Sequence, residues 1–226
     1  NAESRSDRNW STTTKRTPKS DTPGREINLL DRLPQTRRDP KARAAAKTAA
    51  DRMLAKQFGR DFFDGERRHG YGGYRYDGRW LPVAHRLVEH YQLAPDARIL
   101  DVGAAKGFLL HDLLQVLPDA TVRGIDVSAY AKANAHGQTG PLIDLGSAEQ
   151  LPYADRSFDL VISINSIHNL PLPLCKQALA EMERGSRAHK FVTIDAWRTE
   201  EEHQRLLDWI LTAETCLHVD DWVKLF

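Results

Sequence analysis

The nine residues from Ile99 to Gly107, Ile-Leu-Asp-Val-Gly-Ala-Ala-Lys-Gly, constrain the fold of this chain more than any other segment. An apolar run ends in an acidic residue, small residues and glycines follow, and Phe108 then begins a helical pattern. This order predicts a buried strand, a tight turn and a helix. Glycines let a ligand approach the backbone closely, and the first N–H groups of a helix are free to bind it. The turn therefore indicates either a nucleotide-type cofactor site or an ordinary packed core.

Strand and helix patterns alternate from residue 98 onward. The patterns predict strands over 98–102, 121–125, 142–145, 160–164 and 190–194, and helices over 108–116, 129–135, 174–183 and 200–211. Such alternation predicts an α/β fold, in which right-handed crossovers build a doubly wound, mostly parallel sheet with helices on both faces. Ligands of such sheets bind beyond the carboxyl ends of the strands.

The part of the chain before residue 81 divides into two segments. Residues 1–27 are rich in Ser, Thr, Arg, Lys and Pro and nearly lack aliphatic residues, which predicts a flexible tail. Residues 28–80 predict an extension with one helix over 41–57 and a loop over 61–80, where glycine, tyrosine and arginine alternate without a regular period. A helix over 81–91 then opens the main domain, residues 81–226.

Composition excludes several classes of protein. The chain of 226 residues has two cysteines and no CxxC motif, so neither a disulfide framework nor a metal site is predicted. It contains no apolar run of about 18 residues and no signal-peptide pattern, which predicts a cytoplasmic protein outside the membrane. Residues 1–86 carry a net charge of +9 and the rest −8. A basic front indicates an anionic substrate or partner, or simply a solvated basic tail.

Three further segments follow the predicted strands in a set order. Gly124-Ile125-Asp126 places a carboxylate about 20 residues after the glycine turn, where it can accept hydrogen bonds from a ribose diol. Residues 146–153 follow the third strand, and residues 155–163 lead into the fourth. With these motifs, residues 80–226 resemble the class I S-adenosylmethionine-dependent methyltransferases. A nicotinamide dehydrogenase would share only the glycine turn and the carboxylate after the second strand. Its turn would be Gly-x-Gly-x-x-Gly rather than Gly-x-x-x-Gly.

The resemblance implies a Rossmann-like methyltransferase fold that binds S-adenosylmethionine and releases S-adenosylhomocysteine. Asp101 and Gly103 would lie beside the amino-acid portion of the cofactor, Asp126 on the ribose, and Ser147 and Ala148 beside the adenine. The implied cofactor-binding residues are Asp101, Gly103, Ala104, Gly107, Asp126, Val127, Ser147, Ala148, Glu149 and Asn165. Each also has a purely structural interpretation, such as capping or packing of the following helix.

The chain departs from the family pattern at three places. Ala105 stands where the family has its middle glycine, and Ser147 where it often has an aspartate. The family usually ends with two more strands, whereas this chain stops at Phe226 after a helix that begins near Val219. The last strands are therefore expected to be missing, through truncation or because a partner completes the sheet.

Candidates for the transfer step lie outside the cofactor motifs. His168 follows the fourth strand and is the candidate base, because its ordinary pKa suits proton transfer near neutrality; it could instead cap a helix. The loop over 67–80 is expected to be a lid whose arginines bind an anion. The candidate substrate-binding residues are Tyr71, Tyr74, Arg75, Tyr76, Arg79, Trp197 and Arg198.

These observations favour a methyltransferase acting on a small, anionic metabolite or natural-product intermediate. One alternative is an RNA methyltransferase that binds phosphate with its basic N-terminal region, although the acidic main domain argues against nucleic acid as a partner. Another is a non-catalytic scaffold with a methyltransferase-like fold. The sequence leaves open the methyl acceptor and whether the chain forms a homo-oligomer.

Overall fold

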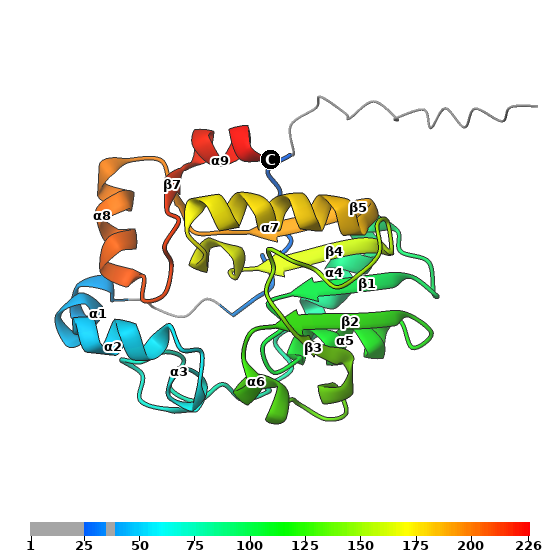
Figure 1. Cartoon of the computed structure of the whole chain (residues 1–226), viewed down its shortest axis with the longest axis horizontal. Helices are drawn as coiled ribbons and strands as arrows, with labels where there is room; N and C mark the ends of the chain where they lie inside the picture. The colour runs from blue at the N-terminus through cyan, green and yellow to red at the C-terminus, as the bar shows by residue number, and fades with distance from the viewer. Residues whose placement is uncertain (1–24, 35–38) are drawn as a thin grey trace, which may run out of the picture.

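A five-stranded parallel sheet forms the centre of the molecule (Figure 1). The computed structural model describes residues 25–34 and 39–226, so most of the predicted flexible tail lies outside the described residues. The sheet has the order β3-β2-β1-β4-β5. Its strands are β1 (Arg98–Val102), β2 (Thr121–Asp126), β3 (Ile143–Leu145), β4 (Phe158–Ile164) and β5 (Ser186–Thr193). All four neighbouring pairs are parallel, which confirms the predicted α/β class.

Helices cover both faces of this sheet. The helices α4 (Leu81–Tyr91) and α5 (Phe108–Val116) lie on one face, and α7 (Leu172–Gly185) lies on the other (Figure 1). The short helix α6 (Ala129–Ala133) follows β2, and the 3₁₀ turns η1 (Gly140–Leu142) and η2 (Ile167–Asn169) precede β3 and follow β4.

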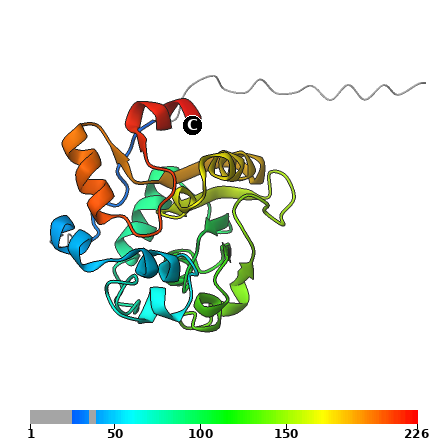
Figure 2. The same ribbon diagram turned by 60° about the vertical axis from the view of Figure 1, so that its left-hand side comes forward.

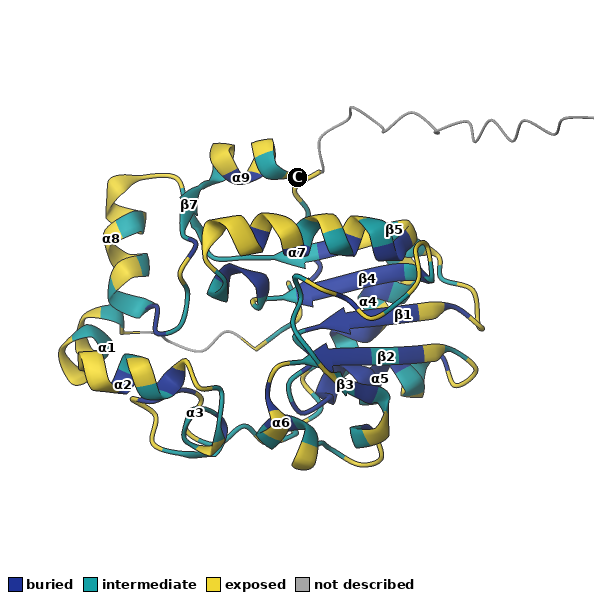
Figure 3. Cartoon of the chain, viewed as in Figure 1, coloured by how far each residue is buried: buried dark blue, intermediate teal, exposed yellow. Residues whose placement is uncertain are grey.

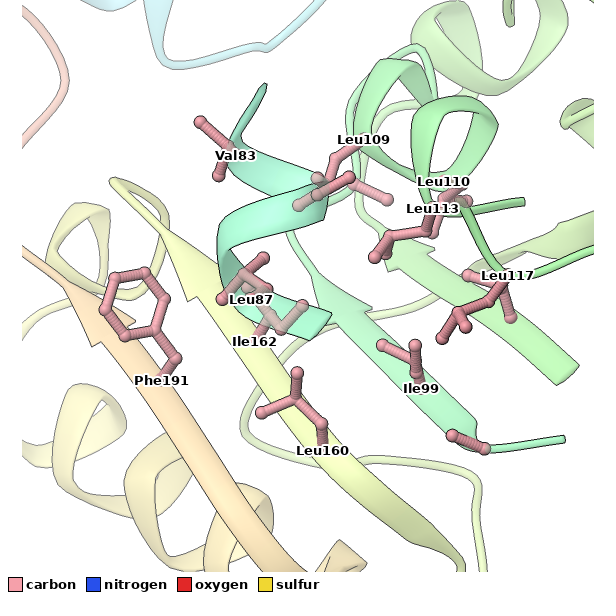
Figure 4. Close-up of a cluster of buried hydrophobic side chains, with 14 of the residues drawn as sticks. Val83, Leu87, Ile99, Leu109, Leu110, Leu113, Leu117, Leu160, Ile162 and Phe191 are labelled. Carbon is pink, nitrogen blue, oxygen red and sulfur yellow. The ribbon is translucent and has the colours of Figure 1, made fainter. Parts of the chain in front are cut away.

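Alternating side chains of the central strands build two separate cores. Ile99 and Leu160 point toward α4 and α5, where Leu87 and Leu110 meet them (Figure 4). The neighbouring Leu100 belongs to a second cluster, under α7. Because successive strand residues point to opposite faces, strands buried on both faces consist of nearly continuous apolar residues. Figure 3 shows β1, β2 and β4 as the most buried part of the molecule.

The N-terminal extension and the C-terminal elements lie beyond the carboxyl ends of the strands (Figure 1). They comprise α1 (Pro40–Ala46), α2 (Ala49–Ala55), α3 (Arg60–Asp64), β6 (Ala196–Trp197), α8 (Glu200–Trp209), β7 (Leu217–His218) and α9 (Val219–Leu225). Both views show α1 beside α8 (Figures 1 and 2). Side chains of α1 and its C-cap bind the end of α8: Arg43 Nε donates to Trp209 O at 2.9 Å, and Lys47 Nζ to Ile210 O at 2.6 Å.

The structure corrects the sequence prediction for residues 41–64. The single predicted helix is two helices, because Thr48 begins a new one: its hydroxyl accepts the Asp51 N–H, and the Asp51 carboxylate accepts the Thr48 N–H. This reciprocal pairing is a capping box. The predicted loop over 61–80 begins with the last four residues of α3, whereas residues 65–80 are irregular as expected. The parallel β6–β7 pair was also not predicted.

Candidate cofactor and substrate site

A cavity of about 760 Å³ opens at the carboxyl ends of β1, β2, β3 and β4. The residues that follow these strands line one side of it, and residues of 58–80, α8 and the segment after α8 line the other. Thirteen predicted site residues line the cavity: Tyr71, Tyr74, Arg75, Arg79, Asp101, Gly103, Ala104, Asp126, Val127, Ser147, Ala148, Asn165 and His168. The topology thus brings together residues that are far apart in sequence.

Only glycine fits at two positions of the turn after β1. Gly103 has a φ of +88°, and a Cβ there would lie 2.0 Å from Ser166 Oγ. Gly107 has a φ of +71° and would meet Thr139 Oγ1 at 2.4 Å. Gly107 lies outside the cavity lining and is the N-cap residue of α5. Its position serves the packing of the turn against Thr139, and Gly103 lies at the cavity itself.

Replacing Gly103 with alanine is expected to destabilise the protein by about 2–3 kcal/mol, because the new methyl group meets Ser166 in a backbone conformation that L-residues avoid. Ser166→Gly in the same chain should recover part of this loss by removing the clash, and the backbone strain should remain. Urea unfolding of both variants measures the two contributions. A Gly103→Ala variant as stable as the wild type would contradict the close approach.

Asp126 joins the second strand end to the glycine turn. Its Oδ2 accepts the Ala105 N–H at 2.7 Å, and its Oδ1 accepts the Ser128 N–H at 2.8 Å. Burial raises the pKa of Asp126, and these backbone donors and the Val127 N–H oppose that rise. Ala105, where the family has glycine, has a positive φ of 48°. The carboxylate therefore holds a strained turn in place while facing the cavity.

Asp101 is the carboxyl group of the site whose pKa is shifted most. Only 4% of the residue is exposed, and its side chain accepts no hydrogen bond from a residue that the structure describes. Burial, together with the nearby charge of Asp126, raises the pKa of Asp101 to about 7. Two carboxyl groups at one end of the cavity favour a cationic ligand group there.

The third and fourth strand ends complete this side of the cavity. Ser147 donates a hydrogen bond to the Glu149 carboxylate, while Glu149 itself lies outside the cavity lining. Asn165, with a φ of +51°, donates its N–H to Thr193 O at 3.0 Å. The fourth strand end is thus pinned to β5, and Ser147 and Ala148 face the cavity.

His168 lies at the cavity, but its hydrogen bonds oppose a role as base. Its Nδ1 accepts the Asp195 N–H at 3.0 Å, so the proton of the neutral ring is on Nε2. Burial lowers the pKa of His168, against the opposing charge of Asp195, whose Oδ2 lies 3.8 Å from Nε2. Neither nitrogen of the neutral ring has a free lone pair for a substrate proton in this arrangement. The hydrogen bond instead links η2 to the segment after β5.

The predicted substrate residues separate into two groups. Tyr71, Tyr74, Arg75 and Arg79 line the cavity, whereas Tyr76, Trp197 and Arg198 do not. The Tyr76 hydroxyl donates to Asp112 at 2.6 Å, Trp197 stacks on His203, and Arg198 pairs with Glu26 at 2.6 Å. These three side chains are therefore held at other places in the structure.

Aromatic residues that the sequence did not single out form much of the opposite wall. Phe58, Phe62 and Trp209 line the cavity, next to Arg67 of the predicted lid. The Phe58 and Phe62 rings lie 5.1 Å apart, and the Arg67 guanidinium lies 5.8 Å from the Trp209 ring. Phe62 lies within the predicted loop over 61–80 and Phe58 shortly before it, so their place in the sequence was a signal for both. Trp209 had no local signal, because its position depends on the packing of α8 on α1.

Carboxylates beside a glycine turn, at the strand ends of a doubly wound parallel sheet, define a Rossmann-like domain built to bind a nucleotide-type cofactor. The comparisons with known proteins identify the class of Rossmann-like domain. Residues 100–194 match the family model described as a methyltransferase domain, and this part of the chain is a class I S-adenosylmethionine-dependent methyltransferase domain. The cofactor of this family is S-adenosylmethionine, and the glycine turn and two cavity carboxylates fit such a cationic nucleoside.

Two relatives and one solved structure illustrate the similarity. An uncharacterised protein of Haemophilus influenzae is 27% identical over 211 residues, which cover 88% of this chain and 68% of that protein. A malonyl-[acyl-carrier protein] O-methyltransferase of Legionella pneumophila is 33% identical over 94 residues, which cover 38% of this chain and 32% of that enzyme. The [4+2]-cyclase SpnF superposes with a TM-score of 0.51 at 21% identity, covering 67% of this chain and 58% of SpnF. This last likeness concerns the fold alone.

Two structural features bear on metal and membrane binding. Within residues 25–34 and 39–226, no group of three or more His, Cys, Asp or Glu side chains is placed to hold a metal ion. No helix in the same part of the chain is long and apolar enough to cross a membrane.

Proposed function

We propose that this chain transfers a methyl group from S-adenosylmethionine to a small, anionic acceptor. The observation that carries the proposal is the division of charge in the cavity. Asp101 and Asp126 lie at one side, and Arg67, Arg75 and Arg79 lie on the segment opposite. The acidic side suits the cationic cofactor, and the basic side suits an anion.

Arg75 is the strongest candidate for the anion-binding residue. The Arg79 guanidinium forms an ion pair with Asp77, with Nη2 2.5 Å from Oδ2. The Arg67 guanidinium donates a hydrogen bond to Gly70 O. Arg75 lines the cavity and makes no ion pair or hydrogen bond with any residue in the described part of the chain. Its donors are free to bind a carboxylate or phosphate in the bidentate manner that arginine favours.

The chemistry of the transfer requires alignment more than proton transfer. The cofactor, when bound, supplies a methyl group already activated on a sulfonium. The residues of the cavity would then hold the acceptor in line with that methyl group, and good alignment lowers a barrier by about 7–11 kcal/mol. An acceptor that is already an anion needs no general base, which agrees with a His168 that has no free lone pair. The wall of Phe58, Phe62 and Tyr71 would exclude water from the acceptor.

Binding of S-adenosylhomocysteine, measured by isothermal titration calorimetry, is the first test of this proposal. A screen of small carboxylates and phosphates for S-adenosylhomocysteine release follows it. Cofactor binding together with release on an anionic acceptor would support the proposal. RNA binding that weakens steeply with salt would favour an RNA substrate instead, and a protein that binds no cofactor would favour a scaffold.

Arg75→Gln is expected to raise the KM of the anionic acceptor by ten- to a hundredfold, because a charge-assisted hydrogen bond contributes about 1.5–3 kcal/mol. The affinity for S-adenosylhomocysteine should stay within twofold. Arg205→Gln, an exposed arginine of α8 outside the cavity lining, is the matched control. Equal KM values for the two variants would show that Arg75 does not bind the acceptor.

A further inference from the structure

The side chain of Asp64, at the end of α3, lies at the centre of a partly buried network between the N-terminal extension and the main domain. Its Oδ2 accepts from Lys106 Nζ at 2.6 Å and from the Tyr130 hydroxyl at 2.7 Å. Its Oδ1 accepts the Tyr74 N–H at 3.1 Å. One carboxylate thus joins three segments: the loop after α3, the glycine turn and α6.

Lys106 closes a ring with the same residues. Its Nζ also donates to the Tyr74 carbonyl at 3.0 Å, so that Asp64 and Lys106 together bind both backbone polar groups of Tyr74. The Lys106 side chain is only 9% exposed. A buried ammonium requires such partners, because an unpaired one would be strongly disfavoured. The ring therefore fixes the backbone at Tyr74 relative to the glycine turn.

Each end of this ring borders the cavity. Lys106 follows directly after Ala104 and Ala105, which line it, and Ala105 binds the Asp126 carboxylate. Tyr74 also lines it, with its ring stacked on Phe108 at 4.6 Å and 4.3 Å from the Tyr71 ring. Asp64 itself is not part of the cavity lining.

We propose that Asp64 is a positioning residue, which couples the geometry of the cofactor turn to the position of the tyrosine wall that faces the acceptor. A change in the turn moves Lys106, and Lys106 and Asp64 transmit that change to Tyr74. On this view, the segment around Tyr71 and Tyr74 is anchored on the cofactor turn and does not swing freely as a lid. The functional consequence rests on the proposed methyl transfer, whereas the mechanical coupling does not.

Asp64→Asn tests the proposal, with Asp61→Asn as the matched control on the same helix. The amide keeps an acceptor oxygen but leaves the Lys106 charge unpaired. We expect about tenfold weaker binding of S-adenosylhomocysteine by calorimetry and a similar rise in acceptor KM. Asp61→Asn should change both by less than twofold. Unchanged cofactor affinity in Asp64→Asn would overturn the proposal.

A second variant separates positioning from the effect of an unpaired charge. Asp64→Asn combined with Lys106→Met removes the buried ammonium and should restore much of the melting temperature lost in the single variant. We expect cofactor affinity to remain weak, because the ring is still broken. Affinity restored together with the melting temperature would overturn the positioning role.

Hydrogen exchange of the ligand-free protein tests the coupling independently of any cofactor. We expect Asp64→Asn to speed amide exchange both over 103–107 and over 71–76, and Asp61→Asn to leave both unchanged. Faster exchange in only one of the two segments would overturn the coupling. A wild-type protein that shows the coupling but binds no S-adenosylhomocysteine would count against the proposed function alone.

Discussion

Asp101→Asn is expected to change the free energy of unfolding, relative to the wild type, by about 4 kcal/mol more in the stabilising direction at pH 8 than at pH 4. Burial and the charge of Asp126 raise the pKa of Asp101 to about 7, while the unfolded chain ionises near the ordinary value of about 3.9. At a pH between these two pKa values, the folded state binds one proton more than the unfolded state. The free energy of unfolding of the wild type therefore falls as the pH rises through that interval. The asparagine variant has no such proton to lose.

Urea unfolding of the wild type and Asp101→Asn at each pH from 4 to 8 measures this difference. Asp119→Asn, which changes an exposed carboxylate, should follow the wild-type curve. The Asp101→Asn variant should also bind S-adenosylmethionine at least tenfold more weakly, because the site loses a negative charge facing the cationic cofactor. A stability difference that stays constant with pH would show that Asp101 ionises normally.

Asp126→Ala is expected to abolish cofactor binding at micromolar concentration, with a loss of at least a hundredfold. The substitution removes the carboxylate expected to accept the ribose hydroxyls. It also frees the Ala105 and Ser128 N–H groups, so the strained turn at Ala105 loses its support. Each lost charged hydrogen bond costs about 1.5–3 kcal/mol.

Isothermal titration of S-adenosylhomocysteine into the wild type and Asp126→Ala checks this expectation. Asp144→Ala is an informative control, because Asp144 lies within β3, the strand beside β2, but pairs with Arg123 at 2.6 Å and lies outside the cavity lining. Binding by Asp126→Ala with unchanged affinity would remove Asp126 from the cofactor site. Equal losses in both aspartate variants would indicate general unfolding of the sheet edge.

Local patterns were sufficient to predict the side of the cavity that the strand ends form. Strand β1, the turn after it and helix α5 were predicted with their observed bounds, because an apolar run, glycines and a second apolar run follow one another directly. Asp126 and Ser147 were placed for the same reason: Asp126 ends β2 and Ser147 follows β3, and parallel strands bring their carboxyl ends to one edge. The boundaries of β5 and the break before Thr48 were less predictable, since capping and strand pairing decide them.

The opposite wall depended on contacts between segments far apart in the sequence. Arg43 and Trp209 are 166 positions apart, and no local pattern indicates that they meet. Similarly, the sequence placed several arginines in one loop, but only the structure distinguishes Arg79, which Asp77 binds, from Arg75, which no described residue binds. The hydrogen bond to His168 Nδ1, which opposes its use as a base, comes from a segment 27 positions away.

The sequence by itself determined the class of fold, the methyltransferase domain and the strand-end residues that line the cavity. These follow from short-range periodicity and from the order of motifs along one chain. The tertiary structure alone decided which side chains complete the cavity, which charges are already neutralised and how Asp64 ties the N-terminal segment to the glycine turn. The physical reason is that burial, ion pairing and the tautomer of a histidine depend on neighbours that only the packing of distant segments supplies.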